Sequence, residues 1–168
     1  MQEEPLPETS ARILGVLESL NVDTIVHRHA PVFTVAEAQA LRGEIPGGHT
    51  KNLFLKDRKG RLFLVTALEN AQIDLKSLHT QIGGSGRLSF GSAELLQEIL
   101  GVQPGAVSPL GLVNDAEKRC KLVLDKALVN FEILNFHPLD NRLTVSVSPS
   151  GLDKLLAHTG HEPQFVEF

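Results

Sequence analysis

The sequence predicts a single α+β domain in which helices flank a mixed, largely antiparallel sheet. Its 168 residues, 42% of them apolar, fit one domain with a buried core over residues 1–168. Segments with the two-residue period of strands are interleaved with segments of helical period. Several connections between them are as short as hairpins, which favours antiparallel pairing over a doubly wound parallel sheet.

The N-terminal part predicts a helix, a strand and a second, short helix. Apolar residues recur at helical spacing over residues 8–20, and residues 23–29 alternate apolar and polar positions as a strand does. Thr34 and Glu37 fit a capping box in front of a short helix over residues 37–41.

The clearest pattern is a β-hairpin. Residues 52–56 and 61–65 are strand-like and apolar, and the turn between them contains Gly60, which can adopt a positive φ. Both strands are apolar enough to lie inside the sheet rather than at its edge.

The remaining elements are bounded by glycine, serine and proline. Helices are predicted over residues 74–82 and 92–100, each ended by a glycine. A third helix begins at Ser148-Pro149 and runs to about His158. β-Branched content and alternation predict strands over residues 87–90, 122–124, 132–136 and 142–147.

Composition excludes several classes of protein. One cysteine rules out an intramolecular disulfide framework, and no apolar run approaches the roughly 20 residues of a transmembrane helix. The formal net charge of −4 and the lack of Trp and Tyr argue against a general DNA-binding protein. We therefore expect a soluble, cytoplasmic protein that binds neither membrane nor DNA.

Histidine and cysteine provide only weak candidates for chemistry. His27 and His29 would share one face of a strand, and His158 and His161 have a spacing seen among metal ligands. Neither pair has acidic or thiol partners nearby in the sequence, so we expect no metal site. Cys120 lies between two basic residues that could lower its pKa, but no base partner accompanies it.

Three further features could each be functional or structural. Lys51 precedes an apolar strand, where it could bind a phosphate, polarise a carbonyl or simply face solvent. Residues 105–109 join a glycine to a proline through small residues, so they could present backbone groups to a ligand or form a tight connection. His137 ends a strand in front of Pro138 and could be a structural histidine.

Taken together, five motifs in order resemble the YbaK-like prolyl-tRNA editing family, which includes the insertion domain of bacterial prolyl-tRNA synthetases and free-standing relatives. Each motif is weak alone, but five in the family's order are specific, and they cover about residues 23–168. The motifs are His29-Ala30-Pro31-Val32-Phe33-Thr34, Lys51-Asn52-Leu53-Phe54-Leu55, Leu88-Ser89-Phe90-Gly91, Gly105-Ala106-Val107-Ser108-Pro109-Leu110 and Asn135-Phe136-His137-Pro138.

The resemblance implies a fold and a set of site residues. The fold is one α+β domain on a curved mixed sheet, with residues 1–22 as a variable N-terminal helix, and neither a metal nor a cofactor is implied. Lys51 is the catalytic lysine by this match. The substrate-binding residues it implies are Thr34, Asn52, Gly105, Ala106, Val107, Ser108, Pro109 and His137.

The resemblance also implies an activity, aminoacyl-tRNA deacylation. The chain is most similar to free-standing members that hydrolyse alanyl-tRNA(Pro), so we expect cleavage of the ester at the terminal adenosine of that mischarged tRNA. The expected partner is the tRNA acceptor end, with prolyl-tRNA synthetase as a further candidate. The alternatives are a deacylase for cysteinyl, seryl or threonyl esters, a non-catalytic module that binds the tRNA end, and a metal-dependent hydrolase that uses the histidine pairs.

Positive charge is concentrated in two segments despite the negative total. Residues 51–61 contain five basic side chains and one acidic one, and residues 118–126 contain four basic and one acidic. Such local patches would suit an enzyme that grips only the acceptor end of a tRNA, although a solvated hairpin tip and a charged turn would have the same composition.

Overall fold

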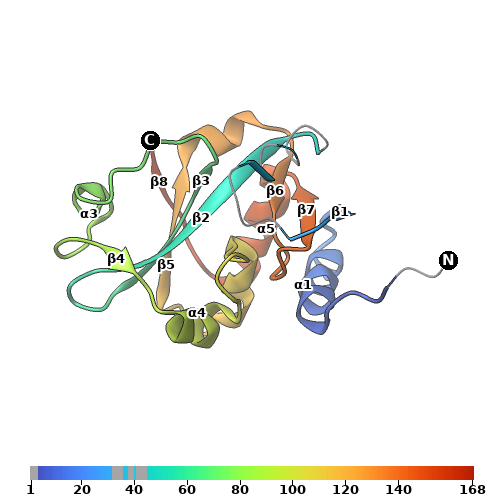
Figure 1. Ribbon diagram of the computed structural model, residues 1–168, viewed down its shortest axis with the longest axis horizontal. Helices are drawn as coiled ribbons and strands as arrows, with labels where there is room; N and C mark the ends of the chain where they lie inside the picture. Colours follow the sequence, from blue (N-terminus) through green and yellow to red (C-terminus); the bar gives the residue numbers. More distant parts are fainter. Residues whose placement is uncertain (1–3, 32–35, 38–39, 41–44) are drawn as a thin grey trace.

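The computed structural model describes residues 4–31, 36–37, 40 and 45–168, and it shows helices packed against one mixed sheet (Figure 1). Within these residues the strand order is β1-β7-β6-β2-β3-β5-β8, and β4 pairs with the end of β2 that β6 does not reach. The strands are β1 (Ile25–Arg28), β2 (Gly48–Lys56), β3 (Leu62–Leu68), β4 (Ser89–Phe90), β5 (Cys120–Asp125), β6 (Leu134–Phe136), β7 (Leu143–Val147) and β8 (Gln164–Val166).

Strand directions confirm the mixed α+β class. Antiparallel pairs join β1 to β7, β7 to β6, β2 to β3, and β2 to β4. Parallel pairs join β6 to β2, β3 to β5, and β5 to β8. Antiparallel pairs are thus the more numerous, and the predicted hairpin of β2 and β3 lies inside the sheet as expected.

α4 (Ala93–Leu100) and α5 (Pro149–Thr159) begin at serine caps and end at glycines, as the sequence predicts. Ser92 and Ser148 each accept a hydrogen bond from a backbone N–H of the following turn, and Gly101 and Gly160 end their helices with a positive φ. The predicted helices over 92–100 and from Ser148 are thereby confirmed. The helical elements are α1 (Glu8–Ser19), α3 (Leu78–Ile82), α4 (Ala93–Leu100), α5 (Pro149–Thr159) and the 3₁₀ helices η1 (Pro109–Asn114) and η2 (Lys126–Asn130).

The predicted starts of α3 and β2 were each wrong by four residues. α3 begins at Leu78 rather than at Asp74, because the Asp74 carboxylate binds the N–H of Lys76 and the hydroxyl of Ser77 and so holds a turn there. β2 begins at Gly48 rather than at Asn52, since a long-range pairing with β6 extends the strand.

Other features lay beyond the local patterns. η1, η2 and β8 were not predicted. The predicted cap at Thr34 and most of the helix over residues 37–41 fall outside the described residues.

The sheet packs a core on each face. Side chains such as Phe54, Leu64 and Phe136 join the main core, which α1, α4 and α5 cover. Leu55 and Phe63 point the other way, into a second core that α3 and the C-terminal segment cover. The middle of the sheet is therefore buried on both sides. No helix in the described ranges has the length and apolarity needed to span a bilayer.

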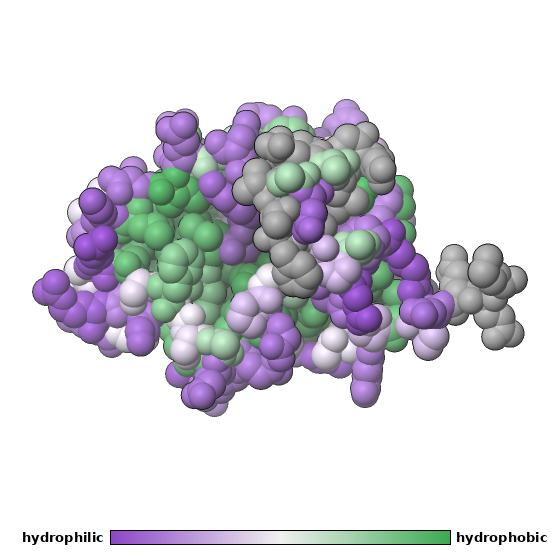
Figure 2. Space-filling model, viewed as in Figure 1, coloured by the Kyte–Doolittle hydropathy of each residue, from purple (hydrophilic) through white to green (hydrophobic). Residues whose placement is uncertain are grey.

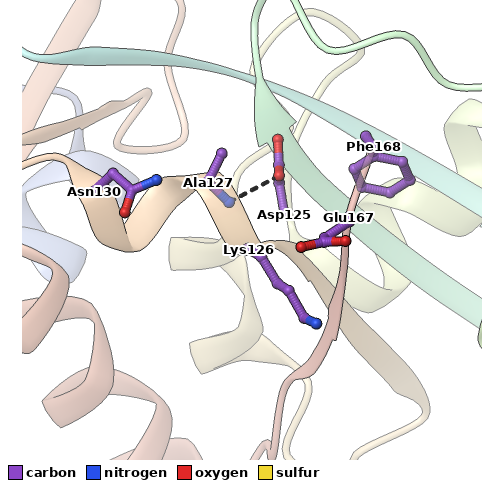
Figure 3. A pocket seen from close by; sticks show the side chains of 6 residues that line it. All are labelled: Asp125, Lys126, Ala127, Asn130, Glu167 and Phe168. Atoms are coloured by element: carbon purple, nitrogen blue, oxygen red, sulfur yellow. Dashed lines mark hydrogen bonds between the residues drawn. The ribbon is translucent and has the colours of Figure 1, made fainter.

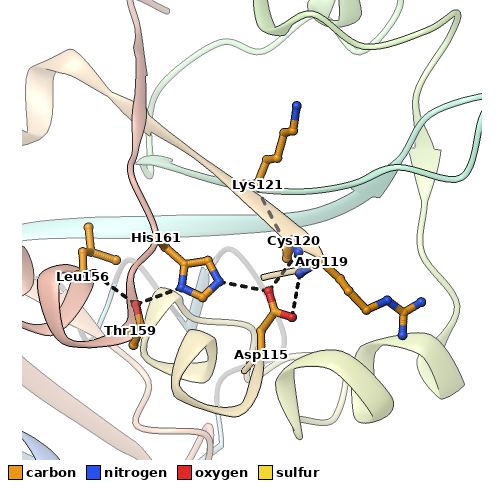
Figure 4. A network of polar contacts seen from close by, with 7 residues as sticks. All are labelled: Asp115, Arg119, Cys120, Lys121, Leu156, Thr159 and His161. Atoms are coloured by element: carbon orange, nitrogen blue, oxygen red, sulfur yellow. Dashed lines mark hydrogen bonds and ion pairs between the residues drawn. The ribbon is translucent and has the colours of Figure 1, made fainter. Parts of the chain in front are cut away.

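A buried polar network ties the start of β5 to the chain after α5 (Figure 4). Asp115 accepts hydrogen bonds from the backbone N–H groups of Arg119 and Cys120, at 2.9 and 2.8 Å. His161 Nε2 lies 3.0 Å from the same carboxylate, and its Nδ1 lies 2.8 Å from the Thr159 hydroxyl. Because Asp115 and His161 are both buried, this network fixes the C-terminal segment on the sheet.

Candidate active site at an opening beside strand β2

One edge of β2 is only partly paired. On the side facing away from β3, β6 pairs with residues 48–49 and β4 pairs with residues 55–56. Among the described residues, no strand pairs with this edge over residues 50–54, and we call this stretch the β2 gap. An opening of this kind leaves backbone hydrogen-bonding groups available to a ligand.

The hydrogen bonds at either end show which backbone groups face the β2 gap. Gly48 N–H donates to Ile133 at 2.8 Å, and the Phe54 carbonyl accepts from Gly91 N–H at 2.9 Å, both across this edge. Since backbone groups alternate in direction along a strand, the N–H and C=O of Asn52 face the β2 gap as well.

Lys51 lies at this opening. It is the fourth residue of β2, half-buried and opposite Ala67 of β3, so it sits within the strand and not at its mouth as the sequence had indicated. Its Nζ donates to the carbonyl oxygen of Ala71, in the segment after β3. An ammonium has three N–H donors, so this single bond holds the side chain and leaves donors for a substrate.

The Asn52 side chain lies on the opposite face from Lys51. Its Oδ1 accepts a hydrogen bond from the hydroxyl of Thr66 at 2.6 Å, and Thr66 is fully buried. The side chain therefore fixes β2 against β3, while the backbone of the same residue borders the β2 gap.

His137 directly follows β6 and is held as a neutral imidazole. Its Nδ1 lies 2.8 Å from the Leu143 carbonyl, which can only accept, so Nδ1 carries the hydrogen and Nε2 is left as an acceptor. Burial lowers the pKa of His137, and the nearby His29 lowers it further, against the opposing effects of the Leu143 hydrogen bond and the Asp140 charge. The two imidazole ring centroids are 6.2 Å apart.

Lys51 and His137 lie on the same face of the sheet. β2 and β6 run parallel, with His49 opposite Asn135. Lys51 and His137 each follow these paired residues by two positions, so their side chains share the facing of His49 and Asn135. Ser10 of α1 supports this region, since its buried hydroxyl donates to the Pro138 carbonyl at 2.6 Å.

Polar side chains continue across the same face of β6 and β7. The Asn135 amide donates to the Pro46 and Gly48 carbonyls and accepts from the Ser146 hydroxyl at 2.6 Å. Thr144, two residues before Ser146, lies 2.8 Å from His29 Nε2. The sequence analysis missed this network, although the alternation of small polar residues with valine over 144–147 was a signal for it.

The loop over residues 105–109 is anchored at its C-terminal end and exposed at its start. Ala106, Ser108 and Pro109 are buried, and Ser108 Oγ accepts from Leu110 N–H as η1 begins. Gly105 is exposed with φ of +94°, a conformation that favours glycine. Val107, half-buried, packs against the main core.

The same loop lies against the turn that carries His137. A Cβ added to Gly105 would lie 3.5 Å from Asn141 Nδ2, in the connection between β6 and β7. The structure thus places Lys51 and the Asn52 backbone at the β2 gap, and it places Gly105 beside the β6–β7 connection that follows His137. Thr34, the remaining predicted site residue, is outside the described residues.

The weaker candidates do not form a second site. Burial, and then the Asp115 carboxylate, raises the pKa of the Cys120 thiol above its usual range, so the expected lowering by neighbouring basic residues was wrong. His158 is exposed, whereas His161 is buried against Asp115, so these histidines do not act as a pair. In the parts of the chain that the structure describes, no three His, Cys, Asp or Glu side chains are placed to hold a metal.

A separate open pocket of about 490 Å³ lies beside η2 and the C-terminal residues (Figure 3). Asp125 is its most buried group, but its carboxylate already accepts from Ala127 N–H at 3.0 Å and from Leu68 N–H at 3.2 Å. None of the predicted site residues lines this pocket.

Comparison with known proteins identifies the family. The profile described as Aminoacyl-tRNA editing domain matches residues 29–155 of this chain. The chain belongs to this family. The match contains every motif that the sequence analysis quoted, from His29 to Pro138, so the recognition made from these motifs is confirmed.

Relatives in the editing family match almost the whole chain. Prolyl-tRNA editing protein ProX of Acetoanaerobium sticklandii is 38% identical over 156 residues, covering 92% of this chain and 94% of ProX. Prolyl-tRNA synthetase associated domain-containing protein 1 of Bos taurus is 39% identical, covering 96% of each chain. The fold is shared with the crystal structure of a candidate trans-editing enzyme for prolyl-tRNA synthetase, with a TM-score of 0.71, 23% identity and coverage of 98% and 99%.

Proposed function

We propose that this editing-family protein hydrolyses alanyl-tRNA(Pro) in trans, releasing alanine from the terminal adenosine of the tRNA. The observation that carries the proposal is the position of Lys51 at the β2 gap, on the same face of the sheet as neutral His137. Its similarity to ProX supports a tRNA(Pro) substrate, and the alanine specificity rests on the resemblance of the motifs to alanyl-tRNA(Pro) deacylases.

The chemistry requires positioning more than a strong nucleophile, because an aminoacyl ester is already activated. Lys51 would donate to the ester carbonyl and stabilise the negative charge that develops as water adds to its carbon. The bond between the acyl carbon and the ribose oxygen then breaks. One proton of the water goes to the ribose oxygen and the other is released to solvent, so the amino acid leaves as a carboxylate. His137 Nε2 would accept a hydrogen bond from the water, and the backbone near Gly105 would hold the α-amino group.

Discrimination against the correct product must come from pocket size. One methylene in an apolar pocket changes binding by only about 1–3 kcal/mol, so a synthetase site for proline cannot fully reject alanine. A second site that admits alanine and excludes the proline ring corrects this error. We propose that the buried anchors of the 105–109 loop, Ala106 and Ser108, set the pocket boundary.

The decisive experiment compares ester hydrolysis by the wild type and by Lys51→Ala. We expect fast release from Ala-tRNA(Pro), no release from Pro-tRNA(Pro), and at least about a hundredfold slower release by the variant, the usual cost of losing one preorganised donor. Lys154→Ala, on the exposed side of α5, is the matched control and should hydrolyse at the wild-type rate. Wild-type hydrolysis that Lys51→Ala leaves unchanged would reject this assignment.

The same assay separates the alternatives. Faster release of cysteine, serine or threonine than of alanine would assign another substrate to the same site. Loss of activity with a chelator would indicate a metal-dependent hydrolase, and tRNA binding without hydrolysis would indicate a binding module. We propose that the protein acts in the cytoplasm, and co-purification with prolyl-tRNA synthetase would test that enzyme as a partner.

A further inference from the structure

The two basic segments of the sequence meet at one end of the sheet. Parallel pairing of β3 with β5 places Leu62 opposite Cys120 and Phe63 opposite Lys121. The tip of the β2–β3 hairpin therefore lies beside the start of β5, at the left of Figure 1. We call the exposed basic side chains here the hairpin-end cluster: Arg58, Lys59, Arg61, Arg87, Lys118 and Lys121.

Asp57 holds the tip of this hairpin in one conformation. Its buried carboxylate accepts from the backbone N–H groups of Lys59, Arg61 and Ser85, and from Arg61 Nε at 2.8 Å. Arg58 N–H donates to the Ser85 carbonyl at 2.8 Å. The hairpin tip is thus tied to the glycine-rich loop over residues 83–86, and the backbone that carries the basic side chains is preorganised.

The glycine loop makes room for one of these side chains. A Cβ on Gly86 would lie 2.9 Å from Arg58 Nε, so the Arg58 side chain extends across Gly86. Arg87 follows directly and is exposed. The segment thus brings Arg58 across Gly86, the residue that precedes Arg87.

Most of the cluster's charge is available to a ligand. Asp57 neutralises Arg61, and Glu98 pairs with Arg119 at 3.4 Å. In the described ranges, Arg58, Lys59 and Arg87 take part in no ion pair. Such exposed cations gain little from packing and are typical of phosphate-binding surfaces.

An exposed aromatic side chain lies between the hairpin-end cluster and the site. β4 pairs with β2 so that Phe90 is opposite Leu55, on the same face as Lys51. Phe90 is 61% exposed, although it is a large apolar residue. Figure 2 shows hydrophobic surface in the left half of the molecule, bordered by hydrophilic side chains at the left end. Exposed aromatic rings beside basic groups are typical of surfaces on which unpaired bases stack.

The spacing suits a nucleic-acid strand that ends at the β2 gap. Six residues of β-strand from Lys51 to Asp57 span about 20 Å, at roughly 3.3 Å per residue. Stacked nucleotides follow one another at about 3.4 Å along a strand, so the cluster would meet phosphates some six nucleotides from the ester. Those phosphates lie beyond the unpaired 3′ end, in the acceptor stem.

We infer that the hairpin-end cluster binds the phosphate backbone of the acceptor stem, and that Phe90 stacks on a base of the unpaired 3′ end. This inference rests on the proposed function, because it assumes that the ester lies at Lys51. The surface adds affinity for the whole tRNA and contributes nothing to the chemical step.

The test uses two substrates that carry the same alanyl-CCA end, one on the whole tRNA and one as the trinucleotide alone. The triple variant Arg58→Gln/Lys59→Gln/Arg87→Gln should hydrolyse Ala-tRNA(Pro) with kcat/KM lowered about tenfold or more near 0.1 M salt, through KM. The variant's kcat/KM should also depend less steeply on salt. The slope of log(kcat/KM) against log(salt concentration) should be smaller by about 0.7–0.9 for each phosphate that the variant no longer binds. Hydrolysis of the trinucleotide CCA esterified with alanine should be unchanged, because this substrate is too short to reach the cluster.

A matched control separates direct phosphate binding from general attraction. Lys76→Gln/Lys126→Gln/Lys154→Gln removes the same charge from exposed positions elsewhere and should behave as the wild type. For the aromatic side chain, Phe90→Ala should raise KM for both substrates, whereas Phe90→Tyr should retain the wild-type KM.

Three outcomes would overturn the inference. Equal losses in the two triple variants would show only long-range attraction. A slower reaction with the CCA ester in the first triple variant would place the effect in the site itself. Arg28 and Arg142 line a pocket with His29. If substitution of these two arginines, and not of the hairpin-end cluster, made the salt dependence shallower, the acceptor stem would bind on that side of the molecule. If the proposed function fails, in contrast, the wild type hydrolyses neither substrate.

Discussion

His137 shows how burial sets the chemistry of a single residue in this site. The ring is neutral because burial lowers its pKa below the ordinary value of 6.5, and the Leu143 carbonyl fixes the hydrogen on Nδ1. Nε2 can therefore accept a proton or a hydrogen bond at a pH where an exposed histidine would be partly charged.

The first prediction concerns the pH dependence of this residue. Protonation removes the acceptor at Nε2, so the deacylation rate should fall with decreasing pH through a midpoint below 6.5. In His137→Gln the rate should be lower and this acid limb should be absent. Hydrolysis followed over a pH range of about 5 to 8, with the spontaneous rate subtracted, measures both. His158→Ala should keep the wild-type profile, and a midpoint above 6.5 in the wild type would contradict the assignment.

The second prediction concerns Gly105. Its φ of +94° is costly for any L side chain, so Gly105→Ala should lower the free energy of unfolding by about 1–2 kcal/mol and weaken substrate binding. Gly15, inside α1 with open space around its Cα, is the matched control. Gly15→Ala should raise the free energy of unfolding by about 1 kcal/mol. Urea denaturation and KM measurements check both, and an unaltered KM in Gly105→Ala would remove the loop from the site.

At the scale of elements, the β2–β3 hairpin depends on one buried carboxylate. Burial alone would raise the pKa of Asp57, but hydrogen bonds from Ser85 and Arg61, with the charge of Arg61, lower it to about 2. The ionised form is therefore favoured in the folded state more than in the unfolded state. Its contribution to stability is present above the ordinary pKa of 3.8 and is lost as the pH falls towards 2.

The third prediction follows from this linkage. Asp57→Asn should be less stable at neutral pH by about 1–3 kcal/mol, because three backbone N–H groups would no longer meet a charged acceptor. As the pH falls from 3.8 to about 2, its free energy of unfolding should decline less than that of the wild type. Asp153→Asn, on the exposed face of α5, is the control for removal of a surface charge. Equal acid sensitivity in Asp57→Asn and the wild type would show that these hydrogen bonds do not keep the carboxylate ionised.

Local signals predicted elements better than they predicted pairings. α4 and α5 were correct because serine caps and terminal glycines act within one turn of the helix. The start of β2 was missed because Ile133 and Leu134, far along the chain, extend it to Gly48. Lys51 was therefore predicted as a site residue from its motif, but its place inside a strand beside an opening required the tertiary pairing.

The whole molecule is held at its C-terminal side by the network of Asp115 and His161. Both groups are buried, so removal of the carboxylate leaves an imidazole and two backbone N–H groups without their partner. Neither residue is among those that border the β2 gap. The role of the network is to fix β5 and the chain that leads to β8.

The fourth prediction tests this structural role. Asp115→Ala should lower the free energy of unfolding by about 3–5 kcal/mol, the usual cost of removing one partner of a buried pair. The folded fraction should hydrolyse ester with the wild-type kcat. Glu117→Ala, exposed and close by in the chain, should change neither quantity. Thermal unfolding and activity per folded molecule measure the two effects, and a lowered kcat would assign the network to catalysis.

The parallel pairing of β2 with β6 also determines when activity can arise during synthesis. Thr50 and Asn135, which are hydrogen-bonded across this pair, lie 85 positions apart in the chain. The N-terminal part of a protein leaves the ribosome first, so Lys51 emerges long before the residues that complete its surroundings. Contacts between such distant residues also form late in folding. A chain cut short before β6 would carry the lysine without the pocket, and it could not release amino acids from tRNA.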